Sequence, residues 1–300
     1  MQTLHGTKNS YSLNDDQVGC LSPGMPFGTA FRTVLITGGE LVFQEGTSYP
    51  AEDYLDSWEK LENLRFDMSN EWVEIVLDYW RGISSALEPG IAVTPFMYRS
   101  PLDLAQSIRG NDLFLDLYDF PDEVDKLVSF CTDWLISFDK FLRDEFPVLE
   151  SATNGVSGYG FNTKCMRLNG DPVDLISEDA IRRFHTPSIY ALSAYAKAIF
   201  FHHHSVGIRT ATVIGETQGI TIQQFLQDPN TPDLLDAIDD TLIESSLQTP
   251  IQLQINLASV KDLEGTVASL ARGRFIVNVV TEKQEECCQL IERIRSLEPN

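Results

Sequence analysis

The chain has 300 residues, of which 43% are hydrophobic and 22% charged, and its formal net charge is −22. This length and composition suit one large α/β domain or two small ones. A field of this sign repels phosphate backbones and anionic lipid surfaces, so neither nucleic acid nor a membrane is expected as a partner. The sequence also has no apolar run of membrane-spanning length.

The N-terminus and the cysteines bear on the compartment. Residues 1–16 are polar and lack the apolar stretch of a secretory signal. The odd number of cysteines, without framework spacing, favours a reducing environment: Cys20, Cys131, Cys165, Cys287 and Cys288. We therefore expect a cytoplasmic protein.

The first half of the chain predicts a mixture of strands and helices after a lead-in over residues 1–37. Short apolar runs predict strands at 34–36, 41–43 and 91–96. Helical spacing of apolar residues predicts helices at 51–64, 70–87, 101–108 and from Pro121 up to Pro147. The proline and the acidic residues after it suit the first turn of that last helix.

The second half alternates more regularly. Strands are predicted at 211–214, 220–225, 251–257 and 275–280, and helices at 177–199, 232–247, 262–270 and from 282. Such alternation implies parallel strands with right-handed crossovers, which fits either a doubly wound sheet or a closed barrel. No G-x-G-x-x-G follows a strand, which weakens the dinucleotide-binding version. Without a linker or repeat, residues 38–300 are expected to form one domain.

Several segments, taken in order, resemble the uroporphyrinogen decarboxylase superfamily over residues 38–295. They are Thr94-Pro95-Phe96 with Pro101-Leu102-Asp103-Leu104-Ala105, Phe120-Pro121-Asp122-Glu123-Val124, Asp171-Pro172-Val173-Asp174-Leu175-Ile176-Ser177, and His204-Ser205-Val206-Gly207. The resemblance implies a (β/α)8 TIM barrel, incomplete or elaborated at the N-terminus, with its site at the C-terminal strand ends. Family members include cofactor-free decarboxylases and zinc-dependent methyltransferases that act on cobalamin proteins or thiols.

The chain departs from this family in two places. Residues 1–37 contain only Lys8 and Arg32 as cations, so the arginine-rich segment that grips propionates is missing and uroporphyrinogen itself is not the expected substrate. Val206 occupies the place of a zinc-binding cysteine, and valine supplies no thiolate. We therefore expect no cofactor; if a metal binds, His204 with Glu216 or Asp171 would hold it.

His204 and Asp171 are the first candidate catalytic residues. His204 matches the family's histidine, and an imidazole can move protons or bind a metal near neutral pH. Asp171 matches an acidic position facing the pocket, where a carboxylate could stabilise a developing cation. The structural alternatives are a core-edge histidine and an aspartate in ordinary turn chemistry.

Two further pairs are expected near the barrel mouth. Tyr159 lies in a glycine-rich loop and is a third catalytic candidate, with Asn162 beside it as a substrate-binding residue. Tyr98 and Arg99 follow the strand at 91–96 and are predicted to bind substrate, because the guanidinium fork matches a carboxylate. A packed loop aromatic and a surface ion pair are the alternatives.

The expected function is decarboxylation or methyl transfer on a small organic substrate, by an enzyme of this superfamily. A corrinoid protein is a candidate partner in the methyl-transfer case, and a homodimer is left open. The alternative is a non-catalytic barrel homologue that binds a ligand, suggested by the missing arginine segment and by Val206.

Overall fold

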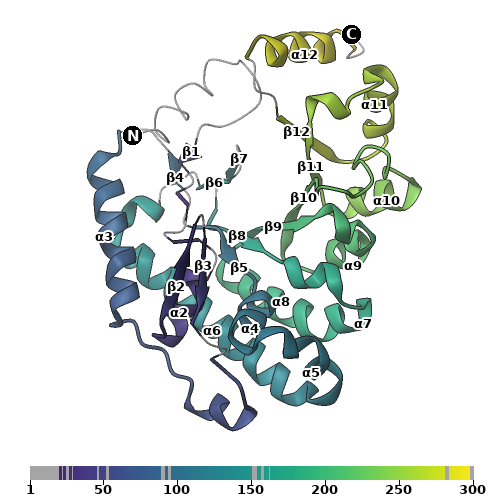
Figure 1. Ribbon diagram of the computed structural model, residues 1–300. Coiled ribbons are helices and arrows are strands. Elements are labelled where there is room, and N and C mark those ends of the chain that lie inside the picture. The colour runs from purple at the N-terminus through teal and green to yellow at the C-terminus, as the bar shows by residue number, and fades with distance from the viewer. Residues whose placement is uncertain are drawn as a thin grey trace.

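A six-stranded parallel sheet organises the protein (Figure 1). The computed structural model describes residues 20–21, 23–24, 27–28, 30–45, 47–51, 54–88, 92–93, 96–150, 154–156, 159–161, 163–280 and 284–297. In sheet order, the strands are β5 Tyr98–Arg99, β8 Cys165–Asn169, β9 Ala198–His204, β10 Ile220–Leu226, β11 Ile251–Asn256 and β12 Phe275–Val280. The fold class is therefore α/β, as the alternating sequence pattern predicts.

The order of these strands follows the chain without a reversal. A doubly wound sheet reverses its strand order at a switch point, so this order argues against the doubly wound alternative. All five strand pairs of the sheet are parallel, which places the C-terminal ends of the strands along one edge.

The helices from α4 onward follow or alternate with the strands of the sheet. They are α4 Pro101–Arg109, α5 Leu113–Asp119, α6 Pro121–Glu145, α7 Glu178–Ala180, α8 Thr186–Tyr195, α9 Ala211–Gly215, α10 Asp240–Gln248, α11 Leu263–Leu270 and α12 Gln284–Leu297. Figure 1 shows α4 to α8 gathered along the earlier strands and α9 to α11 beside the later ones. Alternate strand residues such as Leu168 and Phe201 are fully buried in the main core under these helices.

The opposite face of the sheet changes character along the strands. At the N-terminal ends it is apolar, where Cys165, Phe200 and Ile222 form a small cluster with Phe161. Towards the C-terminal ends it is polar, because the register aligns Asn169, His202, Gln224 and Gln252 on neighbouring strands. His202 Nδ1 lies 2.6 Å from Gln224 Oε1, and Gln224 Nε2 donates to Gln252 Oε1 at 2.8 Å.

Three strand pairs are separate from the main sheet. β1 Cys20–Leu21 pairs in parallel with β4 Ala92–Val93. Two antiparallel hairpins join β2 Leu41–Gln44 to β3 Thr47–Pro50, and β6 Asn154–Val156 to β7 Tyr159–Phe161. The helices α2 Phe31–Thr37 and α3 Glu71–Ala86 belong to this first part of the chain. Within the described residues, no helix combines the length and hydrophobicity needed to cross a membrane.

Several predicted elements are confirmed. α3 begins after Asn70, whose side chain accepts hydrogen bonds from the backbone N–H groups of Trp72 and Val73. α6 begins at Pro121, and β10, β11 and β12 lie where alternation predicted them. The helix predicted at 101–108 ends at Gly110, whose φ of 76° suits glycine.

Other predictions were wrong. The strand predicted at 34–36 is part of helix α2, and the strand predicted at 211–214 is helix α9. Both segments are buried almost throughout, so neither carries a polar face from which a helical period could be read. The helix predicted through Ile199 stops at Tyr195, and β9 begins at Ala198. In the described part of the acidic segment 51–64, the helix is a 3-10 helix at Trp58–Asn63 and no α-helix is present.

Candidate functional site

The candidate site lies at the C-terminal edge of the sheet, where β5, β8 and β9 end side by side. β9 ends at His204, β8 is followed by Asp171, and β5 ends at Arg99. Parallel strands bring their C-terminal ends to a common edge, which is where α/β proteins bind ligands. Residues far apart in sequence therefore meet here.

His204 stands between two carboxylates. Its Nδ1 lies 2.7 Å from Oδ1 of Asp228, and its Nε2 lies 3.5 Å from Oδ1 of Asp171. A carboxylate only accepts hydrogen bonds, so Nδ1–H donates to Asp228 and Nε2 is the atom free to take up or release a proton. The His204 side chain is 27% exposed and that of Asp171 51%, so solvent and small molecules reach this pair.

Asp228 is held rigidly by the turn that follows β9. Its Oδ2 accepts from Ser205 Oγ at 3.1 Å and from the Val206 backbone N–H at 3.2 Å. Ser205 Oγ in turn accepts from the Asp228 backbone N–H at 2.9 Å. Burial acts to raise the pKa of Asp228, but these hydrogen bonds and the one from His204 outweigh it and lower the pKa below its ordinary value.

Asp174 fixes the backbone beneath the imidazole. Its Oδ2 accepts from the His204 backbone N–H at 3.0 Å, and its Oδ1 lies 3.2 Å from Nδ1 of the buried His203. Gly207 packs so closely that a Cβ there would lie 1.7 Å from Asp174 Oδ1. The ring of His204 is thus oriented by Asp228, and its main chain by Asp174.

A buried charge cluster adjoins this pair at the end of β5. Arg99 Nη1 donates to Asp103 Oδ1 at 2.9 Å, and Asp103 Oδ2 also accepts from the Asn169 amide at 3.4 Å. Burial raises the pKa of Asp103 to about 6, against the opposing effect of Arg99. Burial, and then repulsion from Arg99, lower the pKa of Arg32 to about 10. Asp171 interacts electrostatically with both Arg32 and Asp103, which ties the cluster to His204.

The structure brings some of the predicted residues together and places others elsewhere. His204 and Asp171 are neighbours, and Arg99 belongs to the adjoining cluster. Tyr98 is buried, and its hydroxyl donates to Asp139 on α6 at 2.9 Å. Glu216 pairs with Arg182 at 2.8 Å, and no contact with His204 is present among the described residues. Only the backbone of Tyr159, in β7, is described, and Asn162 lies outside the described residues.

The sequence alone does not identify Asp228 as a site residue. Arg32 and Asp174 are noted in it, but neither of them is assigned a role in the site. Asp228 follows the end of β10 by two residues, so it can be found by asking which polar residues follow each predicted strand. Arg32 reads as a remnant of a missing segment, and nothing in the sequence indicates that it packs beside Arg99. Burial is the main cause of its lowered pKa, and the proximity of Arg99 is the second.

The arrangement supplies the parts of a general acid–base. An imidazole oriented by a carboxylate on one nitrogen exchanges protons through the other, and a polar neighbour such as Asp171 can hold a substrate donor. Within the described part of the chain, no group of three or more His, Cys, Asp and Glu residues is placed to hold a metal ion. Comparison of the sequence with protein-family models and with curated proteins found no match.

Proposed function

We propose that the protein is an enzyme resembling the uroporphyrinogen decarboxylase superfamily, and that it decarboxylates a small organic acid with His204 as general acid–base. The observation that carries the proposal is the 2.7 Å contact between His204 Nδ1 and Asp228 at the C-terminal end of β9. That contact leaves Nε2 directed to Asp171, on a side chain that is 27% exposed.

Decarboxylation requires one proton for the carbon that loses CO2, and His204 can supply it. Breaking the bond to the leaving carboxylate releases CO2 and leaves an electron pair on the adjacent carbon. Nε2–H of His204 donates the proton that this carbon needs, and Asp228 stabilises the imidazolium before transfer. A proton from water then restores His204.

Decarboxylation is favoured over methyl transfer by the side chains around His204. Metal-dependent methyl transfer in this family relies on thiolate ligands. The free cysteines of the described region are Cys131 in α6, Cys165 at the start of β8 and Cys288 in α12, and none contacts His204. Burial raises the pKa of the Cys165 thiol to about 12, so it is not a ready thiolate.

We further propose that the sheet belongs to a (β/α)8 barrel. Residues 94–97 alone separate β4 from β5, so the two are best taken as one interrupted strand. β1, this interrupted strand and then β8 to β12 would supply seven of the eight strands, in chain order as barrel strands are. In Figure 1 the β1–β4 pair lies across from β12.

A substrate screen followed by CO2 measurement tests the function. Small mono-, di- and tricarboxylic acids are screened for a rise in Tm, and each stabilising acid is then assayed for CO2 release. We expect at least one to be decarboxylated, and His204→Asn to lower its kcat by at least about 100-fold, within the range for loss of an acid–base group. Glu216→Gln, which removes an exposed carboxylate paired with Arg182, is the matched control.

The outcomes separate the enzyme from a ligand-binding homologue. An acid that binds but never loses CO2 would support the binding protein instead. Equal CO2 release by wild type and His204→Asn would contradict the assignment of His204.

A further inference from the structure

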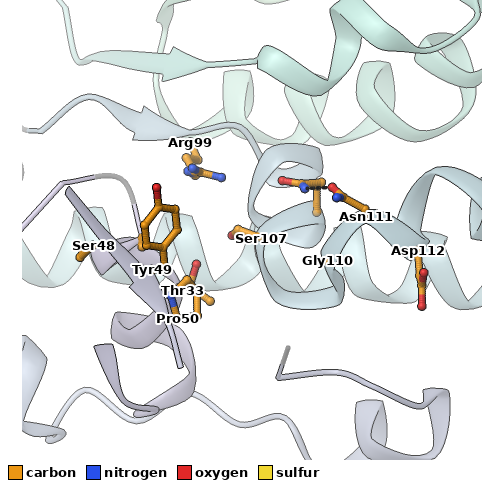
Figure 2. A pocket seen from close by; sticks show the side chains of 11 residues that line it. Thr33, Ser48, Tyr49, Pro50, Arg99, Ser107, Gly110, Asn111 and Asp112 are labelled. Atoms are coloured by element: carbon orange, nitrogen blue, oxygen red, sulfur yellow. Dashed lines mark hydrogen bonds between the residues drawn. The ribbon is translucent and has the colours of Figure 1, made fainter. Parts of the chain in front are cut away.

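A second feature near Arg99 has no part in the chemistry proposed for His204. A cavity of about 430 Å³ lies between the β2–β3 hairpin and helix α4 (Figure 2). Tyr49 of the hairpin, Thr33 of α2, Ser107 of α4 and Arg99 of β5 line it, and Asp112 lies towards its far end. This volume is within the range of small-molecule binding sites.

Two polar groups at this cavity are buried without a hydrogen-bond partner among the described residues. They are Oγ1 of Thr33, whose side chain is almost fully buried, and Nε of Arg99. Buried polar groups are nearly always paired, so orphans on two different elements that line one cavity call for an explanation. A ligand that donates to or accepts from Thr33 and accepts from Arg99 supplies both partners.

The buried charges that interact with Arg99, behind the cavity lining, indicate the sign of that ligand. Arg32 and Arg99 are both largely buried, and Asp103 is the one well-buried carboxylate that interacts with both of them in the described region. The cluster therefore holds one more buried positive charge than it holds buried negative charge. The chain as a whole has a net charge of −22 and therefore repels anions. Binding of an anion here would depend on this local positive charge.

The other walls suit a short polar molecule. Figure 2 shows Tyr49 directed towards Arg99 from the hairpin side, with Ser107 on the helix facing it. Gln106 and Asn111 bond to each other at 3.3 Å and close the helix side of the cavity with amides. The lining thus offers the guanidinium of Arg99 at one end, the carboxylate of Asp112 at the far end, and hydroxyl groups and an aromatic ring near Arg99.

We propose that this cavity is a binding site for a small organic acid, whose carboxylate pairs with Arg99 and whose body lies between Tyr49, Thr33 and Ser107. The carboxylate neutralises the surplus buried charge, and Thr33 gains the hydrogen bond that it lacks. This inference rests on the cavity and stands independently of the reaction proposed at His204.

Binding of acetate, malonate and succinate to the full chain tests the proposal, with acetamide, malonamide and succinamide as uncharged controls. Isothermal titration and thermal shift are run on wild type, Thr33→Val, Ser107→Phe and His204→Asn, with Arg81→Gln as an exposed-arginine control. We expect saturable binding of at least one acid and none of its amide. Ser107→Phe fills the cavity and abolishes that binding, whereas His204→Asn and Arg81→Gln leave it within twofold.

Thr33→Val gives a readout that does not depend on a filled cavity. Removing an orphaned buried hydroxyl should raise the Tm of the ligand-free protein, while weakening the acid several-fold because its hydrogen bond is lost. Binding of none of the three acids, equal binding of acid and amide, or binding that survives Ser107→Phe would overturn the proposal. So would loss of binding in His204→Asn, which would place the acid at the other site.

Discussion

His204, the last residue of β9, and Asp228, in the turn after β10, are joined through Nδ1 and Oδ1 at 2.7 Å. The contact links the C-terminal ends of β9 and β10 outside their backbone ladder. It orients the imidazole and at the same time pins the turn after β10, because Asp228 also accepts from Ser205 and from the Val206 N–H.

Asp228→Asn should weaken both functions of this contact. The amide still accepts one hydrogen bond but carries no charge, so we expect a loss of about 1 kcal/mol in the free energy of unfolding, discounted for the partial exposure of the pair. Because the pKa of Asp228 is lowered from 3.8 in the folded state, its stabilising contribution is present above about pH 4 and is lost as the pH falls through the folded value. Urea unfolding at pH 7 and pH 3 measures this, and the difference between variant and wild type should be smaller at pH 3 than at pH 7. Asp236→Asn, at an exposed position, serves as control.

Gly207→Ala tests the support beneath His204. The new Cβ would lie 1.7 Å from Asp174 Oδ1, so Asp174 must move and release the His204 backbone N–H. We expect a loss of about 2 kcal/mol, typical of overpacking at a tight site. Gly82→Ala is the matched control, because the Cβ that alanine adds there in α3 meets open space and alanine favours helix by about 0.5–1 kcal/mol. Chemical denaturation should show opposite signs for the two variants, and equal signs would contradict the packing argument.

Asp139 is the centre of a buried network, and we expect its substitution to lower the free energy of unfolding more than the substitutions of Asp228 and Gly207. It accepts from the hydroxyls of Tyr98 and Tyr195, each at 2.9 Å, and from Arg143 Nε at 2.7 Å. Asp139→Asn leaves the buried guanidinium without its counter-charge, which costs about 3–5 kcal/mol. Urea titration measures the loss. Asp240→Asn, which removes the exposed partner of Arg272, should change the midpoint little, and a small effect at Asp139 would show that Arg143 finds another partner.

His185 should make the protein sensitive to acid. Both of its ring nitrogens are buried without a hydrogen-bond partner among the described residues. Burial, with a smaller contribution from His203, lowers its pKa from 6.5 to about 3. The unfolded chain therefore binds a proton that the folded chain does not, and stability falls as the pH decreases from about 6.5 towards 3.

His185→Met removes this penalty. We expect the variant to gain about 1–2 kcal/mol at pH 7, because an orphaned polar ring is replaced by an adaptable apolar side chain. The gain should grow as the pH falls to 5. Thermal or urea unfolding at both values provides the measurement, with Arg182→Met at the neighbouring exposed position as control. A gain that is the same at both pH values would mean that burial does not lower the pKa of His185.

Sequence predicts those elements whose local signals agree with their packing. Pro121 and the amphipathic spacing after it locate α6, and the alternation of β11 and β12 with helices predicts parallel strands. Segments 34–36 and 211–214 are buried on all sides, so their sequence lacks the polar face that distinguishes a short helix from a strand. The sheet order, likewise, depends on contacts between distant segments.

In the candidate site, too, some residues can be identified from local sequence and others depend on tertiary packing. His204 and Asp171 could be proposed from their place in a motif, and the structure brings them within 3.5 Å. Asp228 has no local signal beyond its position after a strand, and Tyr98 follows a strand in sequence yet points to Asp139. A position near a strand end predicts that a residue is close to the edge, whereas the direction of its side chain depends on tertiary packing.

The amide row across the polar face of the sheet determines where one proton sits. Gln224 gives its Nε2–H to Gln252, so its Oε1 can only accept from His202, and the His202 ring must carry its hydrogen on Nδ1. Burial lowers the pKa of His202 to about 4, which keeps the ring neutral and leaves a lone pair on Nε2. The tautomer of a histidine on β9 is therefore set by the orientation of a glutamine on β11, two strands away.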